Sequence, residues 1–314
     1  MNAVAAGGLV DPDARDTARM VLRRHGKTFF LASRLLGSRH AERAATLYAF
    51  CRHVDNLADE AVDPQAARLA LAAVARAMYT VEAPDPWTAA MLKLQSSSGM
   101  PMAPVLDLVE GVSSDLDPVR IADEAALVRY AYQVAGTVGL MMCAVLDVRD
   151  PRAHPFAIDL GIAMQLTNIA RDVGEDARMG RRYLPSGWIG EVEPSSIASP
   201  DAVLQRRLQA GTQRLLALAE RYYASAERGL GFLPLRARLA ILVAARLYRA
   251  IGARIAANGH ASWDRRAVVS TPRKVLYALR ALVDFALLQR LHRRDAAHDA
   301  SLQVALRPAI GRDD

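Results

Sequence analysis

The sequence predicts an all-α protein folded as a single domain. Aromatic residues make up only 6% of the 314 residues, and Ala, Leu and Arg dominate, a composition that favours helices over strands. Apolar residues recur at three- and four-residue spacings along several long segments, whereas no segment alternates convincingly as a strand would. With no repeat and no linker that demands a second domain, we expect one domain over residues 13–295. We also expect a loose tail at 1–12 and a flexible tail at 296–314.

Proline and capping signals separate the expected helices. Asp63 and Pro64 mark one helix start, because proline is favoured in the first helical turn, and Asp123 can cap another helix. Between Pro84 and Pro101 the punctuation predicts only short pieces. The expected helices cover residues 13–24, 38–60, 66–79, 103–113, 123–147, 152–177, 199–227, 234–257 and 272–294.

Charge and cysteine usage narrow the range of partners and compartments. A formal net charge of +7 suits acidic partners such as diphosphates, anionic lipid surfaces or nucleic acid. The basic residues are spread along helices without interleaved aromatic residues, which argues against nucleic acid. Cys51 and Cys143 lie far apart and are expected to be buried thiols in a reducing cytosol. With no signal-peptide pattern and no apolar run of about 20 residues, we expect a cytoplasmic protein without a transmembrane helix.

The expected helix at 152–177 carries the most informative polar stripe of the chain. Its members follow one another at spacings of three, four and four residues, which places them on one helical face. They are Gln165, Asn168, Asp172 and Asp176. The apolar residues between them fall mostly on other faces and can bury the helix in a core. These are Leu166, Ile169, Ala170 and Val173.

A second acidic stripe lies on the expected helix at 38–60, where Arg52, Asp55 and Asp59 share a face. If the two stripes faced each other, each carboxylate pair at about 6 Å and an effective dielectric near 20 would repel by about 3 kcal/mol. Divalent cations would remove this penalty, and carboxylate oxygens suit Mg²⁺. One Asp-x-x-x-Asp pair is weak support, but two such stripes, with nearby cations and helices rich in small residues, indicate a metal-bound diphosphate above an apolar cavity.

Four other segments can serve or surround such a site. Residues 25–30 (HGKTFF) either form a turn with two aromatic core plugs or bring a cation and a hydroxyl to a phosphate. In residues 130–139 the small side chains fit either tight helix packing or a slender apolar ligand, and the glycine spacing does not match a phosphate loop. Residues 180–185 carry two cations and a phenol. The basic helix at 272–294 fits a solvated face or a membrane-surface contact.

These segments resemble the squalene/phytoene synthase family. YAYQVAGTVG at 130–139 and LGIAMQLTNIARDVGEDARMGRRYLP at 160–185 are similar to its two signature segments. FCRHVDNLADE at 50–60 resembles its first aspartate-rich motif, and residues 25–29 its N-terminal flap. Within the family, the second signature is most like that of bacterial phytoene synthases. Position 56 is Asn where many relatives carry a second Asp, which puts the contribution of this position to metal binding in doubt.

The resemblance implies an isoprenoid-synthase helical bundle around a central cavity, with Mg²⁺ or Mn²⁺ as cofactor and no NADPH. The implied metal ligands are Asp55, Asp59, Asn168, Asp172 and Asp176. The implied catalytic residues are these four aspartates, Gln165 near the reacting carbons, and Tyr130 and Tyr183 along the path of the cation. The implied substrate-binding residues are His25, Lys27, Thr28, Phe29, Arg52, Val134, Ala135, Val138, Gly139, Arg171, Arg182 and Tyr248.

The implied reaction is the Mg²⁺-dependent head-to-head (1′–1) condensation of two geranylgeranyl diphosphates to phytoene through prephytoene diphosphate. An enzyme that makes squalene, dehydrosqualene or presqualene diphosphate from farnesyl diphosphate is the alternative within the same chemistry, because the sequence does not show tunnel depth. A non-catalytic helical assembly factor is an alternative of another class, but such a protein should have eroded acidic stripes. The paired acidic motifs also suit a head-to-tail synthase, although the Gln-x-x-Asn pattern argues against it. Oligomeric state and product double-bond geometry stay open.

Overall fold

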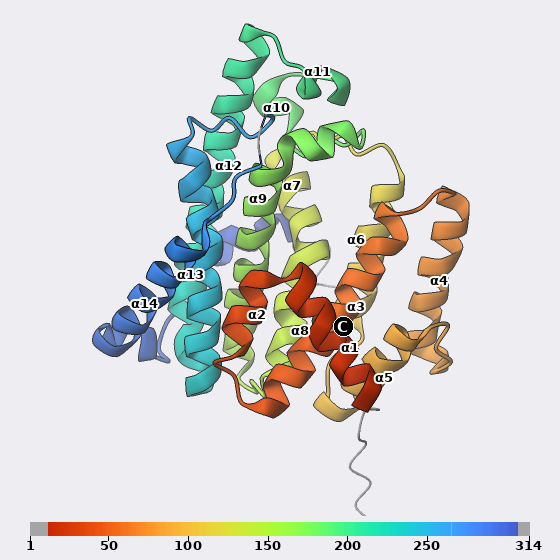
Figure 1. Ribbon diagram of the computed structural model, residues 1–314, viewed down its shortest axis with the longest axis vertical. Coiled ribbons are helices and arrows are strands. Elements are labelled where there is room, and N and C mark those ends of the chain that lie inside the picture. Colours follow the sequence, from red (N-terminus) through yellow and green to blue (C-terminus); the bar gives the residue numbers. More distant parts are fainter. Residues whose placement is uncertain (1–11, 265, 307–314) are drawn as a thin grey trace, which may run out of the picture.

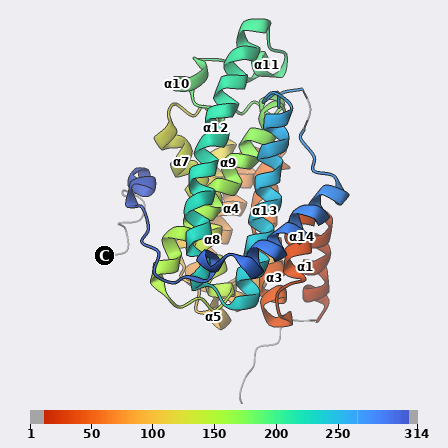
Figure 2. The same cartoon turned by 90° about the vertical axis from the view of Figure 1, so that its left-hand side faces the viewer.

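One central helix, α9 (His154–Arg178), is surrounded by the other helices in the computed structural model (Figures 1 and 2). The structure describes residues 12–264 and 266–306. Helix α9 packs against α12 (Ala202–Gly229), α13 (Leu235–Ala257) and α8 (Thr137–Val145). Leu166, Ile169, Ala170 and Val173 are buried, whereas all four members of the polar stripe are half-buried. The predicted division of this helix into apolar and polar faces is therefore confirmed.

The N-terminal part of the chain folds into six helices, of which α3 to α6 lie on the right of Figure 1. The acidic helix α3 packs against α1, α4 and α5. Its apolar side is buried through Leu47, Phe50 and Val54, as the periodicity predicts. The bounds are α1 Pro12–His25, α2 Lys27–Ser33, α3 Ser38–Asp59, α4 Pro64–Thr80, α5 Pro86–Ser98 and α6 Ala103–Ser113.

The remaining elements complete the bundle around α9 and its upper end (Figure 1). The α-helices are α7 Glu124–Ala131, α8, α9, α10 Ser186–Ile189, α11 Pro194–Ala198, α12, α13 and α14 Thr271–Leu287. A π-helical segment, Tyr132–Gly136, joins α7 to α8. Short 3₁₀ turns cover Ser114–Leu116, Pro151–Ala153, Leu230–Phe232, Gln289–His292 and Ala300–Leu306.

Aspartate caps set several helix starts. The Asp63 side chain accepts a hydrogen bond from the Gln65 amide, and Pro64 occupies the first turn of α4. Asp123 accepts from the Ala126 amide at the start of α7. Asp85 caps α5 in the same way, and the whole stretch 86–98 forms one helix where the sequence predicted only short pieces. That prediction was wrong because the serines at the end of α5 bond back to carbonyls within the helix.

Three other predicted boundaries differ from the structure. The helix expected at 123–147 is interrupted by the π-helical segment. Gly136 in this segment has no side chain, which lets the backbone pack closely on α9. The helix expected to reach residue 294 ends at Leu287. In the segment 25–30 only Gly26 breaks the helical pattern, and residues from Lys27 onward form α2. A Cβ at position 26 would lie 2.8 Å from the Tyr48 ring, so this close approach requires glycine.

The segment after residue 296 packs on the bundle up to residue 306, which corrects the prediction of a flexible tail for that part. Leu302 and Leu306 are buried in the core around α9. The buried carboxylate of Asp159 accepts hydrogen bonds from Ser225 (2.5 Å) and Gln303 (2.8 Å), and lies 2.8 Å from His298 Nε2. Residues 307–314, like the predicted N-terminal tail up to residue 11, lie outside the described residues.

Two remaining predictions concern cysteines and membrane spans. Cys143 is buried, Cys51 is half-buried, and both are free thiols. Among the described residues, no helix is both long and apolar enough to cross a bilayer. The described residues contain no strand, and their one bridge-type backbone pairing joins Arg120 to Arg182.

Candidate active site

The acidic faces of α3 and α9 meet at Asp115, in the 3₁₀ turn after α6. Burial raises the pKa of Asp55 to about 7, with the negative charge of Asp59 as the second cause and that of Asp115 as a further one. Burial likewise raises the pKa of Asp176 to about 8, together with the charges of Asp172, Glu175 and Asp115. Carboxylates from both helices thus lie within electrostatic reach of Asp115, which stands between the two acidic faces.

Arg181 contacts the acidic face of α3, and its charge also partly offsets the burial that raises the pKa of Asp176 on α9. It stands in the loop after α9 and donates to Asp59 Oδ1 on α3 at 2.7 Å. A second, longer hydrogen bond of 3.4 Å reaches the backbone carbonyl of Asp115. The side chain is only 12% exposed, so it supplies a nearly desolvated positive charge between the carboxylates. The sequence reasoning named the neighbouring arginine instead and missed this one.

Arg182 points away from the acidic faces and holds the loop together. Its guanidinium is buried and donates to the backbone carbonyls of Ile121 and Leu184, at 3.0 Å each. It also contacts the exposed carboxylate of Glu191 at 3.2 Å. These partners occupy both terminal nitrogens of Arg182 within the loop, and only its buried Nε has no partner. Consecutive residues in an extended segment point to opposite sides, which explains how the assignment shifted by one position.

Two buried tyrosines share one carboxylate. Tyr130 donates to Asp115 Oδ2 and Tyr183 donates to Asp115 Oδ1, both at 2.8 Å, and the two hydroxyl oxygens are 3.1 Å apart. Their rings lie 4.9 Å apart between centroids. Burial raises the pKa of both tyrosines, so both stay protonated at neutral pH. Asp115 was not singled out from the sequence, because it lies in a polar segment without a motif.

Asp172 is held between two guanidinium groups. Arg171 donates to its carboxylate through Nε at 2.9 Å, and Arg266 Nε lies 2.9 Å from Asp172 Oδ1. Arg266 also reaches Glu175 at 3.5 Å. Because Arg266 follows Asp172 by 94 residues, no local pattern in the sequence could have pointed to it. The free protein therefore balances this acidic face with its own arginines.

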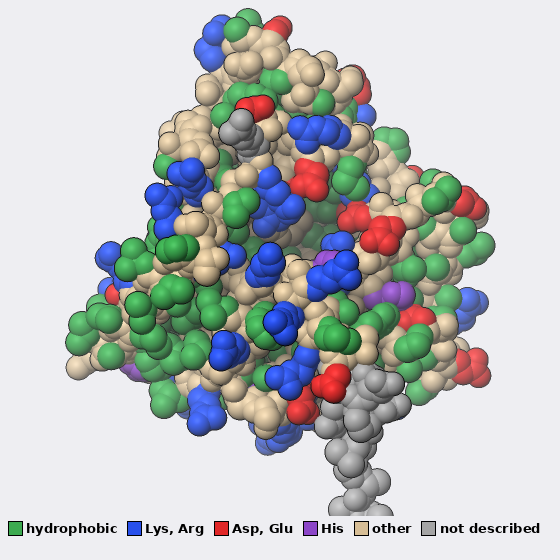
Figure 3. All heavy atoms as spheres, in the orientation of Figure 1, with side chains coloured by type: hydrophobic (Ala, Val, Ile, Leu, Met, Phe, Trp, Pro, Cys, Tyr) green, Lys and Arg blue, Asp and Glu red, His purple; other side chains and the backbone are tan. Residues whose placement is uncertain are grey.

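The N-terminal segment reaches the same end of α9 through an aromatic contact. The Phe29 ring lies 5.1 Å from that of Tyr248 on α13 and 6.0 Å from that of Tyr48 on α3. Tyr248 lies near the charges of Arg171 and Asp172, and burial raises its pKa. Lys27 is exposed, Thr28 is half-buried and His25 is exposed. Figure 3 shows basic and acidic side chains gathered around the middle of this face of the molecule.

Several polar atoms at the two faces are buried without a partner. They are Arg52 Nε and Asn56 Oδ1 on α3, and Asn168 Oδ1 on α9. The Asn168 amide nitrogen donates to Gln165 Oε1 at 3.2 Å, which leaves its oxygen free for a ligand. Buried polar atoms without partners are costly, so a polar ligand that contacts them would stabilise this arrangement.

The donor set fits a hard cation only when a ligand completes it. Amide and carboxylate oxygens from two helices are the donors that Mg²⁺ takes, and unpaired Asn168 Oδ1 is one of them. Within the described residues, however, no three acidic, histidine or cysteine side chains converge closely enough to hold an ion by themselves. Mg²⁺ commonly binds through one or two carboxylates together with substrate phosphates. The residues present therefore suit an ion that arrives with a diphosphate.

The residues predicted to border the prenyl chains divide between packing and the apolar interior. A Cβ on Gly139 would lie 2.1 Å from the Ala157 carbonyl oxygen, and one on Gly161 equally close to that of Ala135. Gly139 and Ala135 therefore form a close helix contact with α9, the first of the two alternatives from the sequence. Val134 packs against both major apolar clusters, and Val138 against the one that contains Phe50.

Comparisons with known proteins agree with this geometry. A solved dehydrosqualene synthase in complex with ligand matches with a TM-score of 0.77 at 29% identity, covering 87% of this chain and 97% of that chain. The 15-cis-phytoene synthase of Enterobacter agglomerans is 36% identical over 260 residues, 79% of this chain and 88% of that protein. The phytoene synthase of Cereibacter sphaeroides is 39% identical over 277 residues, 83% and 77% respectively.

The fold and the paired acidic faces define an all-α isoprenoid synthase. A family model described as squalene/phytoene synthase matches residues 22–273. The chain belongs to the squalene/phytoene synthase family, which confirms the resemblance seen in the sequence.

Proposed function

We propose that this chain is a prenyltransferase that condenses two geranylgeranyl diphosphates head to head to give phytoene. The observation that carries the proposal is the convergence of the α3 and α9 carboxylates on Asp115, which forms a buried cluster with Tyr130 and Tyr183. Arg181 pairs with Asp59 beside this cluster. Curated relatives named phytoene synthase, at 36% and 39% identity, favour the twenty-carbon substrate.

Cations would be held by the residues of the two acidic stripes. We assign Asp55, Asp59, Asn168, Asp172 and Asp176 as ligands of Mg²⁺, with Mn²⁺ as the alternative, and diphosphate oxygens complete the coordination. Bound there, the metal supplies charge that makes the departing diphosphate a better leaving group. The neighbouring Arg52, Arg171 and Lys27, and the Tyr248 hydroxyl, bind and orient diphosphate oxygens.

The chain itself binds, shields and deprotonates the cationic intermediates. One substrate ionises, its allylic cation alkylates the double bond of the other, and loss of a proton closes a cyclopropane ring. The second ionisation rearranges the ring to the 1′–1 linkage, and loss of another proton gives phytoene without a reductant. Apolar walls around Val134 exclude water from the cation. The released diphosphate accepts a proton, or the Tyr130 hydroxyl accepts one while it passes its own proton to Asp115.

The test is to incubate the purified chain with Mg²⁺ and each diphosphate separately, and to identify the hydrocarbon. We expect phytoene from geranylgeranyl diphosphate. Product from farnesyl diphosphate alone would reject the twenty-carbon assignment. The chain would then make squalene, dehydrosqualene or presqualene diphosphate, an alternative supported by the match to a dehydrosqualene synthase. An Asp172→Ala variant with unaltered yield would reject the metal site, and the exposed Asp117→Ala serves as its control.

We also propose that α14 makes a peripheral contact with the cytoplasmic face of the membrane. Its outer face exposes Val275, Leu276, Leu279 and Leu287, while Ala281 is its one described buried residue. Arg273 and Lys274 stand at its first turn, and a basic amphipathic helix of this kind can lie in an anionic lipid interface. Flotation with anionic vesicles tests this contact, and Leu276→Glu should abolish it. Binding that survives this change would exclude α14 as the contact.

A further inference from the structure

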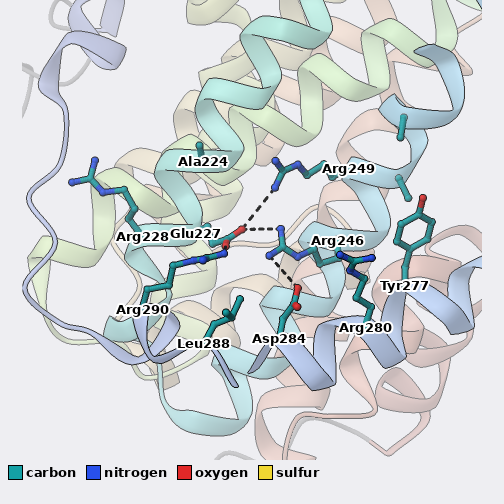
Figure 4. A pocket seen from close by; sticks show the side chains of 12 residues that line it. Ala224, Glu227, Arg228, Arg246, Arg249, Tyr277, Arg280, Asp284, Leu288 and Arg290 are labelled. Atoms are coloured by element: carbon teal, nitrogen blue, oxygen red, sulfur yellow. Dashed lines mark hydrogen bonds and ion pairs between the residues drawn. The ribbon is translucent and has the colours of Figure 1, made fainter. Parts of the chain in front are cut away.

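A second charged cavity lies outside the candidate active site, between α12, α13 and α14 (Figure 4). Its volume is about 710 Å³. On α13 it is lined by Arg246, Arg249 and Ala250, whose spacings of three and four residues define one helix face. None of its lining residues is among those assigned to the metal ions, the diphosphates or the prenyl chains.

The cavity has more positive than negative charge. Five arginines line it, from α12, α13, α14 and the turn after α14, against the two carboxylates of Glu227 and Asp284. Glu227 is shared among three of these arginines: Arg246 at 2.8 Å, Arg290 at 3.4 Å and Arg249 at 3.7 Å. Arg246 is also paired with Asp284 at 3.6 Å, and Arg249 with Glu220 outside the cavity lining. Five guanidinium groups therefore meet three carboxylates, and an excess of positive charge faces the cavity.

Arg280, on α14, adds a further positive charge to the cavity. In Figure 4 no interaction joins Arg280 to any other lining side chain, and it points toward the arginines of α13. Arg228 uses its guanidinium to donate to the Ala297 carbonyl at 2.7 Å, which fixes its position without neutralising it. Burial lowers the pKa of Arg249, which is further support for a desolvated site.

An oxyanion with several oxygens matches this arrangement. Guanidinium groups present planar, paired N–H donors that fit phosphate oxygens, and charge-assisted bonds of this type are among the strongest in proteins. A metal ion would be repelled, and an apolar ligand would leave the arginines unsatisfied. We propose that the cavity between α12, α13 and α14 binds a phosphate group through Arg246, Arg280 and Arg290.

Two sources could supply this phosphate, and both present the same chemistry. One is the headgroup of an anionic phospholipid, because the cavity adjoins a helix with an exposed apolar outer face. The other is free inorganic phosphate from solution. The site is independent of the proposed condensation, since none of its lining residues lies on α3 or α9.

The test uses the full chain with the double change Arg280→Gln and Arg290→Gln. The matched control is Arg221→Gln with Arg236→Gln, which removes two exposed arginines of α12 and α13 that lie outside the cavity and outside α14. Neither arginine in the test pair is buried, so both variants should fold, and thermal melts verify this. Binding is measured by titration calorimetry with inorganic phosphate in EDTA, and by flotation with phosphatidic acid vesicles. EDTA suppresses metal-dependent binding at the acidic faces.

We expect the test pair to weaken binding of at least one probe by about tenfold or more, since two charge-assisted bonds are lost, while the control changes it little. Loss in calorimetry assigns free phosphate, and loss only in flotation assigns the lipid headgroup. Equal binding by the test and control variants, or no binding of either probe by the unchanged chain, would overturn the proposal. Leu276→Glu separates the two membrane arguments, because it alters the apolar face and leaves the arginines in place.

Discussion

Replacing Asp176 with asparagine should stabilise the substrate-free protein while it removes activity. Burial and the nearby charge of Asp172 raise the pKa of Asp176 from 3.8 to about 8. Near neutral pH the folded chain therefore keeps a proton on this carboxyl group, whereas the unfolded chain has already released it. A carboxyl group with a pKa raised by folding costs stability as the pH rises from the unfolded to the folded pKa. At about 1.36 kcal/mol per unit, the upper limit is about 5 kcal/mol near pH 7.5 and about 1 kcal/mol near pH 4.5. Solvent screens this half-buried group, so we expect about 2 kcal/mol near pH 7.5.

Urea unfolding of both proteins near pH 7.5 and pH 4.5, without divalent ions, measures this difference. The control is Asp147→Asn. The pKa of Asp147 is lowered despite partial burial, by a hydrogen bond with His40 and the charges of Arg39 and Arg43, so its ionised form stabilises the fold above the unfolded pKa. That control should lose stability near pH 7.5. The reasoning is refuted if Asp176→Asn is no more stable than the unchanged chain near pH 7.5, or if its gain is as large near pH 4.5.

The same variant separates stability from ligand binding. Mg²⁺ added with inorganic diphosphate should raise the Tm of the unchanged chain, because a ligand that binds only the folded state stabilises it. Either component alone should raise the Tm less, since no three side chains of the described residues form an ion site unaided. Asp176→Asn should lose most of the joint effect despite its greater stability in the free state.

Four further changes test other parts of the structure. Arg181→Gln should lower kcat about tenfold with a small effect on stability. Arg182→Gln should instead lower the free energy of unfolding by about 2 kcal/mol, because two backbone carbonyls lose a charged donor. Steady-state kinetics and urea unfolding distinguish the two variants, and reversed outcomes would contradict the assignment. Asp115→Asn should lower kcat about tenfold with little change in KM, since one tyrosine hydroxyl loses its acceptor oxygen and the cluster loses its negative charge. An unchanged kcat would remove Asp115 from the site. Gly139→Ala should lower the free energy of unfolding by about 3 kcal/mol, because its Cβ would lie 2.1 Å from a carbonyl oxygen. The control is Gly187→Ala, whose Cβ would lie 3.4 Å from the nearest carbonyl oxygen. Equal melting temperatures of the two variants would contradict the close contact.

The sequence predicted the features that depend on regular spacing. The stripe at Gln165, Asn168 and Asp172 and the apolar residues between them follow from helical geometry alone, and the structure places each on its predicted face. The caps at Asp63 and Asp123 follow from local chemistry, which a short window of sequence contains. The family followed from long motifs that combine both kinds of information.

The features that the sequence did not predict depend on contacts between distant residues. Arg266 reaches Asp172 from a loop 94 positions away, and nothing in either segment encodes that meeting. Asp115 acquires its importance only when the fold brings it between Tyr130 on α7 and Tyr183 in the loop after α9. The packing of Leu302 and Leu306 was missed because the segment is too short to show a clear helical period, and it is anchored by the distant Asp159, which accepts from Gln303.

Arginine partners explain how the acidic faces persist without a ligand. Asp59 is paired with Arg181, and Asp172 with Arg171 and Arg266, whereas Asp55 and Asp176 have raised pKa values and can stay protonated. A diphosphate that enters with cations offers each group a new partner: arginines can turn to phosphate oxygens, and carboxylates can release their protons to coordinate metal. Binding is then an exchange of partners within a preformed charge cluster. It should release protons, and calorimetry in buffers of different ionisation enthalpy would detect them near pH 7.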